Sequence, residues 1–69
     1  MTRAEIARAD GFTIVSVGNG WGYEFCRNGA DRVLWFQDDD ATQFRAEFDA
    51  FPDTTHTAHI LHTLWEQYA

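Results

Sequence analysis

Apolar and polar residues alternate through the first half of the chain in three short runs. The runs are Phe12–Val17, Trp21–Arg27 and Arg32–Gln37. Alternation with a period of two residues is typical of β-strands that bury one face. Asn19-Gly20 and Asn28-Gly29 separate the runs, and Asn-Gly is a strong hairpin signal because both residues tolerate positive φ. The pattern therefore predicts a three-stranded antiparallel meander with Trp21–Arg27 in the middle.

Strand register decides which side chains share a face of this sheet. A two-residue loop at Asn19-Gly20 places Ile14 opposite Phe25 and Ser16 opposite Tyr23, and a shift by two residues keeps the same faces. We expect one face to form the core. This face carries Phe12, Ile14, Trp21, Tyr23, Phe25, Leu34 and Phe36. The opposite face carries Thr13, Val15, Val17, Gly22, Glu24, Cys26, Val33 and Trp35.

The opposite face is more apolar than a solvent-exposed face usually is. If the second loop is Asn28-Gly29 rather than the longer Asn28–Asp31, Trp35 lies opposite Gly22, where its ring covers the bare glycine backbone. The pattern leaves two interpretations open: either the N-terminal segment covers this face, or the face binds a partner or a second copy. The residues of such a dimer surface are Val15, Val17, Val33 and Trp35.

The residue pattern of the N-terminal segment, Met1–Asp10, predicts a short helix. Thr2 and Glu5 have capping-box spacing, Ile6 supplies an apolar position, and Gly11 suits the C-terminal cap. A helix of this length is not stable without docking, so a frayed or disordered segment is the alternative.

After the third strand the apolar period becomes that of a helix. The apolar stripe consists of Ala41, Phe44, Phe48 and Phe51. Pro52 requires this helix to stop by Phe51, because the residue before a proline disfavours the helical conformation. Of the run Asp38-Asp39-Asp40, Asp39 or Asp40 is the expected N-cap, and the neighbouring carboxylates favour the positive end of the helix dipole.

A second amphipathic helix follows Pro52, with Asp53 as the expected N-cap. Its apolar stripe consists of Ala58, Leu61, Leu64, Trp65 and Tyr68. The chain of 69 residues is therefore predicted to be one small α+β domain, residues 1–69, in which both helices pack on one face of the meander. Domains of this size bury only about 60% of their unfolded surface.

Charge is distributed unevenly along the chain. Residues 1–37 contain four acidic residues and four arginines, whereas residues 38–69 contain seven acidic residues and one arginine, so the net charge of −6 lies in the second half. This balance excludes a basic surface for direct nucleic-acid binding. An acidic helical surface is instead attracted to a basic partner. The expected partner-binding residues are Asp38, Asp39, Asp40, Glu47, Asp49, Asp53 and Trp35.

The histidines of the last helix raise the question of a metal site. His56, His59 and His62 stand three residues apart, and successive steps of three diverge around a helix. Catalytic zinc motifs use two histidines four residues apart with a glutamate between them, which this helix lacks. Capture of adventitious metal by two of these histidines, or their pairing with nearby acids, is therefore preferred to a structural or catalytic zinc site. The sequence predicts no cofactor.

The sequence shows no arrangement for nucleophilic catalysis and no glycine-rich phosphate loop at a helix start, so we expect a protein that is not an enzyme. Cys26 is the only cysteine, which excludes an internal disulfide. There is no apolar run near the length of a membrane span and no signal-peptide pattern. The expectation is a soluble cytoplasmic protein without a membrane segment.

Three stretches carry a resemblance to other proteins: Val17–Tyr23, Trp35–Ala41 and the helix that contains Phe44. Together they resemble short acidic proteins of phages, prophages and plasmids. Among proteins of that origin and size, the anti-CRISPR proteins are the best-understood class. These are, as a rule, non-enzymatic binders that occupy a basic nucleic-acid-binding or subunit surface of a CRISPR effector. The resemblance implies a class of protein and transfers no residue-level motif.

Three functional hypotheses follow from the sequence. The preferred one is a non-enzymatic acidic protein that blocks a basic surface of a partner, as an anti-CRISPR inhibitor does. The second is a homodimeric domain that associates through the apolar outer face of the sheet. The third is a metal-binding protein that uses the histidine-rich helix.

Overall fold

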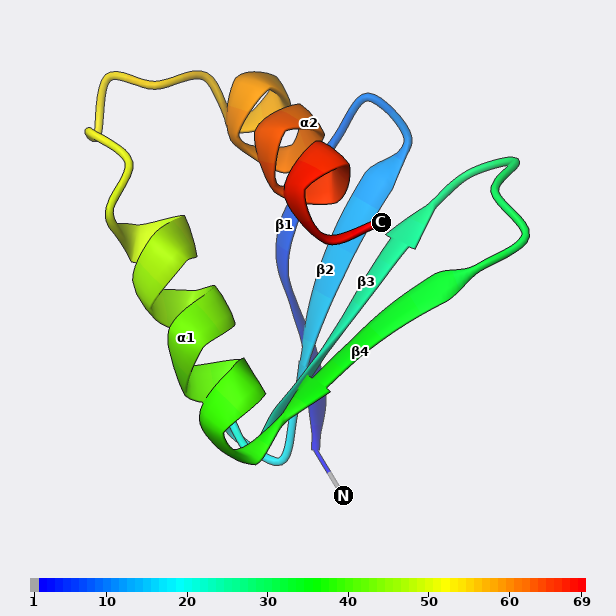
Figure 1. The fold of residues 1–69 in the computed structure, drawn as a ribbon, viewed down its shortest axis with the longest axis vertical. Helices are drawn as coiled ribbons and strands as arrows, with labels where there is room; N and C mark the ends of the chain where they lie inside the picture. Colours follow the sequence, from blue (N-terminus) through cyan, green and yellow to red (C-terminus); the bar gives the residue numbers. More distant parts are fainter. Residues whose placement is uncertain (1) are drawn as a thin grey trace.

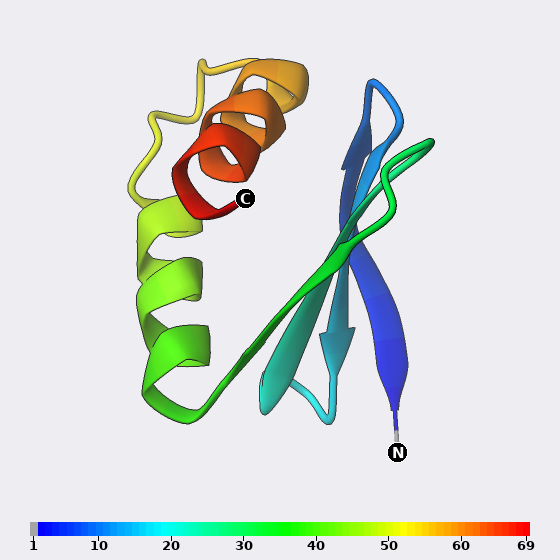
Figure 2. The same ribbon diagram turned by 45° about the vertical axis from the view of Figure 1, so that its right-hand side comes forward.

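The computed structural model describes residues 2–69 as a four-stranded antiparallel sheet with two helices on one face (Figure 1). The elements in chain order are β1 (Arg3–Ala9), β2 (Phe12–Val17), β3 (Gly22–Arg27), β4 (Val33–Gln37), α1 (Asp38–Asp49) and α2 (Thr57–Tyr68). The spatial order of the strands equals their sequence order. Figure 2 shows the helices as one layer and the sheet as the other. The predicted α+β class is confirmed, and the predicted number of strands is wrong by one.

β1 replaces the helix that was predicted at the N-terminus. It pairs antiparallel with β2, from Arg3 opposite Val17 to Ala9 opposite Phe12. The turn between them is Asp10-Gly11, with φ values of 50° and 81°, so it takes the left-handed conformation that Asp-Gly hairpins favour. An isolated short helix pays a high nucleation cost, whereas the edge of β2 offers a full row of hydrogen-bonding groups. Met1 belonged to the predicted helix and lies outside the described residues.

The three predicted strands are confirmed, with bounds that differ by at most one residue. Ile14 lies opposite Phe25 as predicted. In the second hairpin Glu24 lies opposite Trp35, which corresponds to the longer of the two loops considered. Inside this loop the Ala30 N–H donates to the Arg27 carbonyl at 3.1 Å, which closes a β-turn around Asn28-Gly29, and strand pairing begins only beyond the loop, at Cys26 and Val33.

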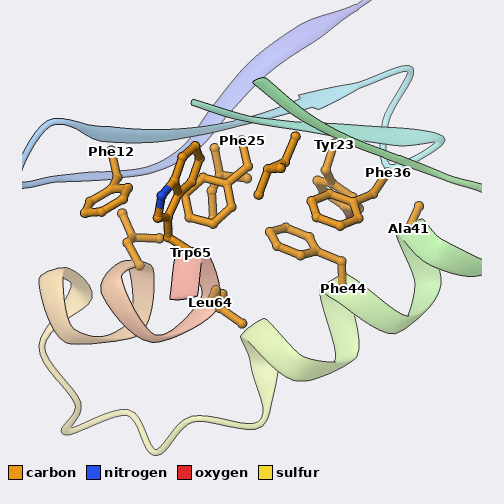
Figure 3. Close-up of a cluster of buried hydrophobic side chains, with 11 residues drawn as sticks. Phe12, Tyr23, Phe25, Phe36, Ala41, Phe44, Leu64 and Trp65 are labelled. Atoms are coloured by element: carbon orange, nitrogen blue, oxygen red, sulfur yellow. The ribbon is translucent and has the colours of Figure 1, made fainter. Parts of the chain in front are cut away.

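The hydrophobic core fills the space between the sheet and the helices (Figure 3). α1 packs against β3 and β4, and α2 packs against β1 and β2. Phe44 stacks on Phe36 with ring centroids 4.3 Å apart, and Trp65 meets Phe25 edge-on at 5.2 Å. The buried cluster consists of Phe12, Ile14, Tyr23, Phe25, Leu34, Phe36, Ala41, Phe44, Leu61, Leu64 and Trp65. The predicted core face and both predicted helix stripes therefore meet.

Trp21 was predicted to lie on the core face and does not. Its side chain is 49% exposed, and its ring lies against Trp35 on the opposite face of the sheet. The three residues before it, Gly18, Asn19 and Gly20, all have positive φ. A backbone in this conformation leaves the regular pleat, so the alternation that holds within β3 does not extend back to Trp21.

α1 begins earlier than predicted. Its first residue is Asp38, directly after β4, and Gln37 takes the N-cap position without a side-chain hydrogen bond. The prediction of Asp39 or Asp40 as N-cap is therefore wrong, because the chain passes from strand to helix with no intervening loop. The carboxylates instead occupy the first helical turn, where they still favour the dipole. The helix ends at Asp49, within the predicted limit.

α2 begins later than predicted. His56 is its N-cap, without a side-chain hydrogen bond, and Asp53 lies in the connection between the helices. The prediction of Asp53 as N-cap is therefore wrong. The Thr55 N–H donates to the Pro52 carbonyl at 2.9 Å, so these residues form a turn before the helix starts. Within residues 2–69, neither helix combines the length and the hydrophobicity that crossing a membrane requires.

Candidate partner-binding surface

The three consecutive aspartates lie in the first turn of α1, and all three are exposed. None of the ion pairs formed within residues 2–69 involves Asp38, Asp39 or Asp40. Because β4 passes directly into α1, this turn is fixed at one end of the sheet, close to the turn between β2 and β3 (Figures 1 and 2). The direct passage from strand to helix therefore places a compact group of carboxylates at one corner of the molecule.

Two exposed tryptophans lie at the same end of the sheet, on the face away from the helices. Gly22 pairs with Gln37, so Trp21 and Asp38 flank the same cross-strand pair. The centroids of the Trp21 and Trp35 rings are 5.9 Å apart. The exposed fractions of these two residues are 49% and 42%. The structure thus brings Trp35, a predicted site residue, together with the aspartates and adds a second tryptophan.

The Trp35 ring is held in place on two sides. Its indole Nε1 donates to the Oε1 atom of Gln37 at 2.8 Å. The ring also covers Gly22, where an added Cβ would lie only 2.6 Å from the ring. The prediction that Trp35 covers this glycine is confirmed, although the two residues are diagonal rather than directly opposite. A ring that is already ordered loses little conformational entropy when a partner binds.

The other predicted acidic residues lie away from this corner. Glu47 is half-buried and accepts a hydrogen bond from the Tyr68 hydroxyl, so its carboxylate joins the two helices. Asp49 pairs with Arg45 at 3.0 Å. Glu47 and Asp49 are in the last part of α1, roughly 15 Å along the helix axis from its first turn. Asp53 is exposed in the connection between the helices.

Residues 2–10 of the N-terminal segment do not cover the outer face of the sheet. They extend the sheet beside β2, so the interpretation that the N-terminal segment covers this face is wrong. Arg3 reaches over the face to Glu24, with an Nη2–Oε1 distance of 3.1 Å. Val17 is only 5% exposed, whereas Val33 is 57% exposed. The exposed apolar part of this face is therefore smaller than predicted and lies toward β4.

Cys26 is half-buried on the outer face, and its Sγ lies 3.6 Å from the Oε1 atom of Glu24. Burial raises the pKa of the thiol above its ordinary value, and the hydrogen bond and negative charge of Glu24 act in the same direction, while Arg3 opposes them. A raised pKa keeps the thiol protonated at neutral pH. The reactive thiolate is the form that acts as a nucleophile, so these surroundings favour a structural role for Cys26.

The three histidines of the last helix are exposed and do not converge on one point. His62 approaches Asp10, with 3.2 Å between Nε2 and Oδ2, and its ring meets Phe12 edge-on. Among residues 2–69, no group of three histidine, cysteine or acidic side chains is placed to hold a metal ion. The geometry of the described residues therefore offers no donor set for the metal-binding alternative.

A hollow of about 190 Å³ lies beside β4 and was not anticipated from the sequence. It is lined by Trp35, Phe36, Asp40, Gln43 and Tyr68. Tyr68 comes from the C-terminal turn of α2, so no local pattern places it near β4. The hollow adjoins the acidic corner through Asp40.

Comparisons of the chain with protein-family models, with curated proteins and with solved structures give no match. The chemistry of the surface itself is therefore the basis for a functional proposal. That chemistry combines negative charge, two exposed tryptophan rings and a hollow at one end of the sheet.

Proposed function

We propose that this chain is a non-enzymatic binding protein that occupies a basic surface of a partner protein in the cytoplasm. The observation that carries the proposal is the juxtaposition of Asp38–Asp40, which form no internal ion pair within the described residues, with the exposed Trp21 and Trp35 rings. Tryptophan side chains dominate binding energy at many interfaces. Carboxylates beside them steer a basic partner and select against an acidic one.

The chemistry of the partner follows from the charge of this corner. Arginine is a favourable counterpart, because its guanidinium pairs with carboxylates and also stacks on aromatic rings. The arginines of β1 do not weaken this preference, since Arg3 and Arg8 pair with Glu24 and Glu5. The resemblance to phage and plasmid proteins suggests one version of the proposal, an anti-CRISPR inhibitor whose carboxylates take the place of nucleic-acid phosphates on an effector subunit.

Neutralising the acidic corner is expected to weaken binding without unfolding the protein. We expect the combined Asp38→Asn, Asp39→Asn and Asp40→Asn variant to bind its partner about tenfold or more weakly, because three charge interactions are lost. The measurement is a pull-down at low salt followed by titration of the captured partner at low and high salt. Binding of the native chain should weaken steeply as salt increases.

A matched variant controls for the change in net charge. It combines Asp10→Asn, Asp31→Asn and Glu66→Gln, which remove the same charge from exposed positions outside the corner. This variant should retain most of the affinity, and circular dichroism should show that both variants are folded. Binding that does not respond to salt would contradict the proposal.

A homodimer is the second candidate function, favoured by the exposure of Trp21, Val33 and Trp35 on one side of the sheet. Burying these side chains in a second copy would remove apolar surface from water. A Trp35→Asp substitution would then place a carboxylate in the interface and shift the protein from dimer to monomer. Light scattering over a range of concentrations measures this directly, and a native chain that stays monomeric at high concentration would eliminate the candidate.

A further inference from the structure

The two edges of the sheet are built differently. β1 contains a register shift between Glu5 and Ala7, and three of its seven residues are charged. β4 pairs with β3 in unbroken register and contains no charged residue. Irregularity and charge are the usual means by which proteins block the addition of another strand to a sheet edge. β1 has both protections, and β4 has neither.

The open edge of β4 borders the hollow described above. Trp35 and Phe36 are consecutive in the strand, and they point to opposite faces of the sheet, since Trp35 is exposed and Phe36 is buried in the core. A hollow lined by both must therefore open at the edge of the strand rather than on one face. Its other walls are Asp40 and Gln43 of α1 and Tyr68 of α2. With Trp35 and Phe36, these walls present a carboxylate, an amide and three aromatic rings.

We propose that an extended basic segment of the partner adds to β4 as a fifth strand and places a lysine or arginine side chain in this hollow beside Asp40. The inference rests on the proposed function and specifies the form in which the partner presents its positive charge. Backbone groups on alternate residues of β4 supply the hydrogen bonds that hold an added strand. The aspartates at the C-terminal end of β4 complement further positive charges along the same segment.

Blocked peptides that alternate lysine and valine test the inference. We expect the unmodified peptide to bind and to slow hydrogen exchange of backbone amides in β4. Two isomers of this peptide carry backbone N-methyl groups, one at every valine and the other at every lysine. Both keep the charge, and they differ only in which edge of the peptide lacks backbone N–H donors. One isomer should bind at least about tenfold more weakly than the other, because an added strand uses only one of its edges.

Two variants locate the basic side chain. Asp40→Asn should weaken binding of the unmodified peptide several-fold, whereas Glu66→Gln, at an exposed position of α2 that does not line the hollow, should leave it unchanged. A peptide that alternates glutamate and valine should show no binding.

Equal binding by the two N-methylated isomers would overturn strand addition while leaving the acidic-surface proposal intact. Protection of β1 instead of β4, or no binding of the unmodified peptide, would also overturn the inference. The proposed function is judged separately, by the salt dependence of the captured partner.

Discussion

Replacing Phe44 with alanine is expected to remove most of the stability of this protein. The Phe44 side chain is fully buried and stacks on Phe36, and its ring centroid lies within 5.8 Å of those of Tyr23, Phe25 and Tyr68. Truncating a buried phenylalanine to alanine costs about 3–5 kcal/mol. A domain of this size has a free energy of unfolding of roughly 3–10 kcal/mol, so a large fraction of molecules should unfold.

Urea denaturation followed by circular dichroism measures this loss. Phe48→Ala is the matched control, because it is the same substitution on the same helix at a half-buried position. We expect it to cost less than half as much as Phe44→Ala. Equal costs at the two positions would contradict the conclusion that Phe44 is the centre of the contact between α1 and the sheet.

Replacing Gly22 with alanine is expected to displace the Trp35 ring and to destabilise the sheet by about 1–3 kcal/mol. The added Cβ would lie 2.6 Å from the Cη2 atom of Trp35 and 3.2 Å from the backbone oxygen of Phe36. The ring is the part that can move, but moving it breaks its hydrogen bond to Gln37. Tryptophan fluorescence and urea denaturation report the two effects.

A double-mutant cycle separates this clash from a general effect of alanine. In a Trp35→Ala background the methyl group at Gly22 meets no ring, so the substitution should cost at least about 1 kcal/mol less than in the native chain. Gly29→Ala is the control. Its added Cβ has no neighbour within 4 Å, but its φ of 82° is strained for alanine. That cost arises in the backbone and should not depend on Trp35, so a cycle without coupling between Gly22 and Trp35 would refute the prediction.

The parts of the fold that were predictable are those set by short-range patterns. The alternation in Phe12–Val17 and Trp21–Arg27 determined two strands and their register, because a one-residue slip would expose every core side chain. The helical spacing of Phe44 with its neighbours determined the buried side of α1. The period of the pattern and the burial in the structure agree except at Trp21, which is exposed, and at Val17, which is buried on the outer face.

The N-terminal strand was not predicted because two short-range signals conflicted. Thr2 and Glu5 have the spacing of a helix start, and Asp10-Gly11 has the composition of a hairpin turn. The capping signal stabilises a helix by only about 1 kcal/mol, whereas pairing with β2 satisfies backbone groups along seven residues. Pairing with β2 therefore determined that this segment is a strand and not a helix. Gly11 lies in the turn between β1 and β2 rather than at the end of a helix.

The site was only partly predictable, for a related reason. The acidic run Asp38–Asp40 is visible in the sequence, and Trp35 was identified beside it. The placement of Trp21 depends on consecutive positive-φ residues, and the hollow depends on Tyr68, which is far from β4 in the sequence. Features that combine distant segments or irregular backbone leave no periodic signal.

The position of α2 has a consequence for how the fold is acquired. Each strand pairs with its neighbour in the chain, so the sheet assembles through short loop closures that cost little entropy. α2, however, comes after all the strands and returns to cover β1 and β2. Until Leu61 and Trp65 are available, Phe12 has no cover from that helix. During synthesis on the ribosome, the nascent hairpins would therefore wait for α2 before the packing over β1 and β2 is complete.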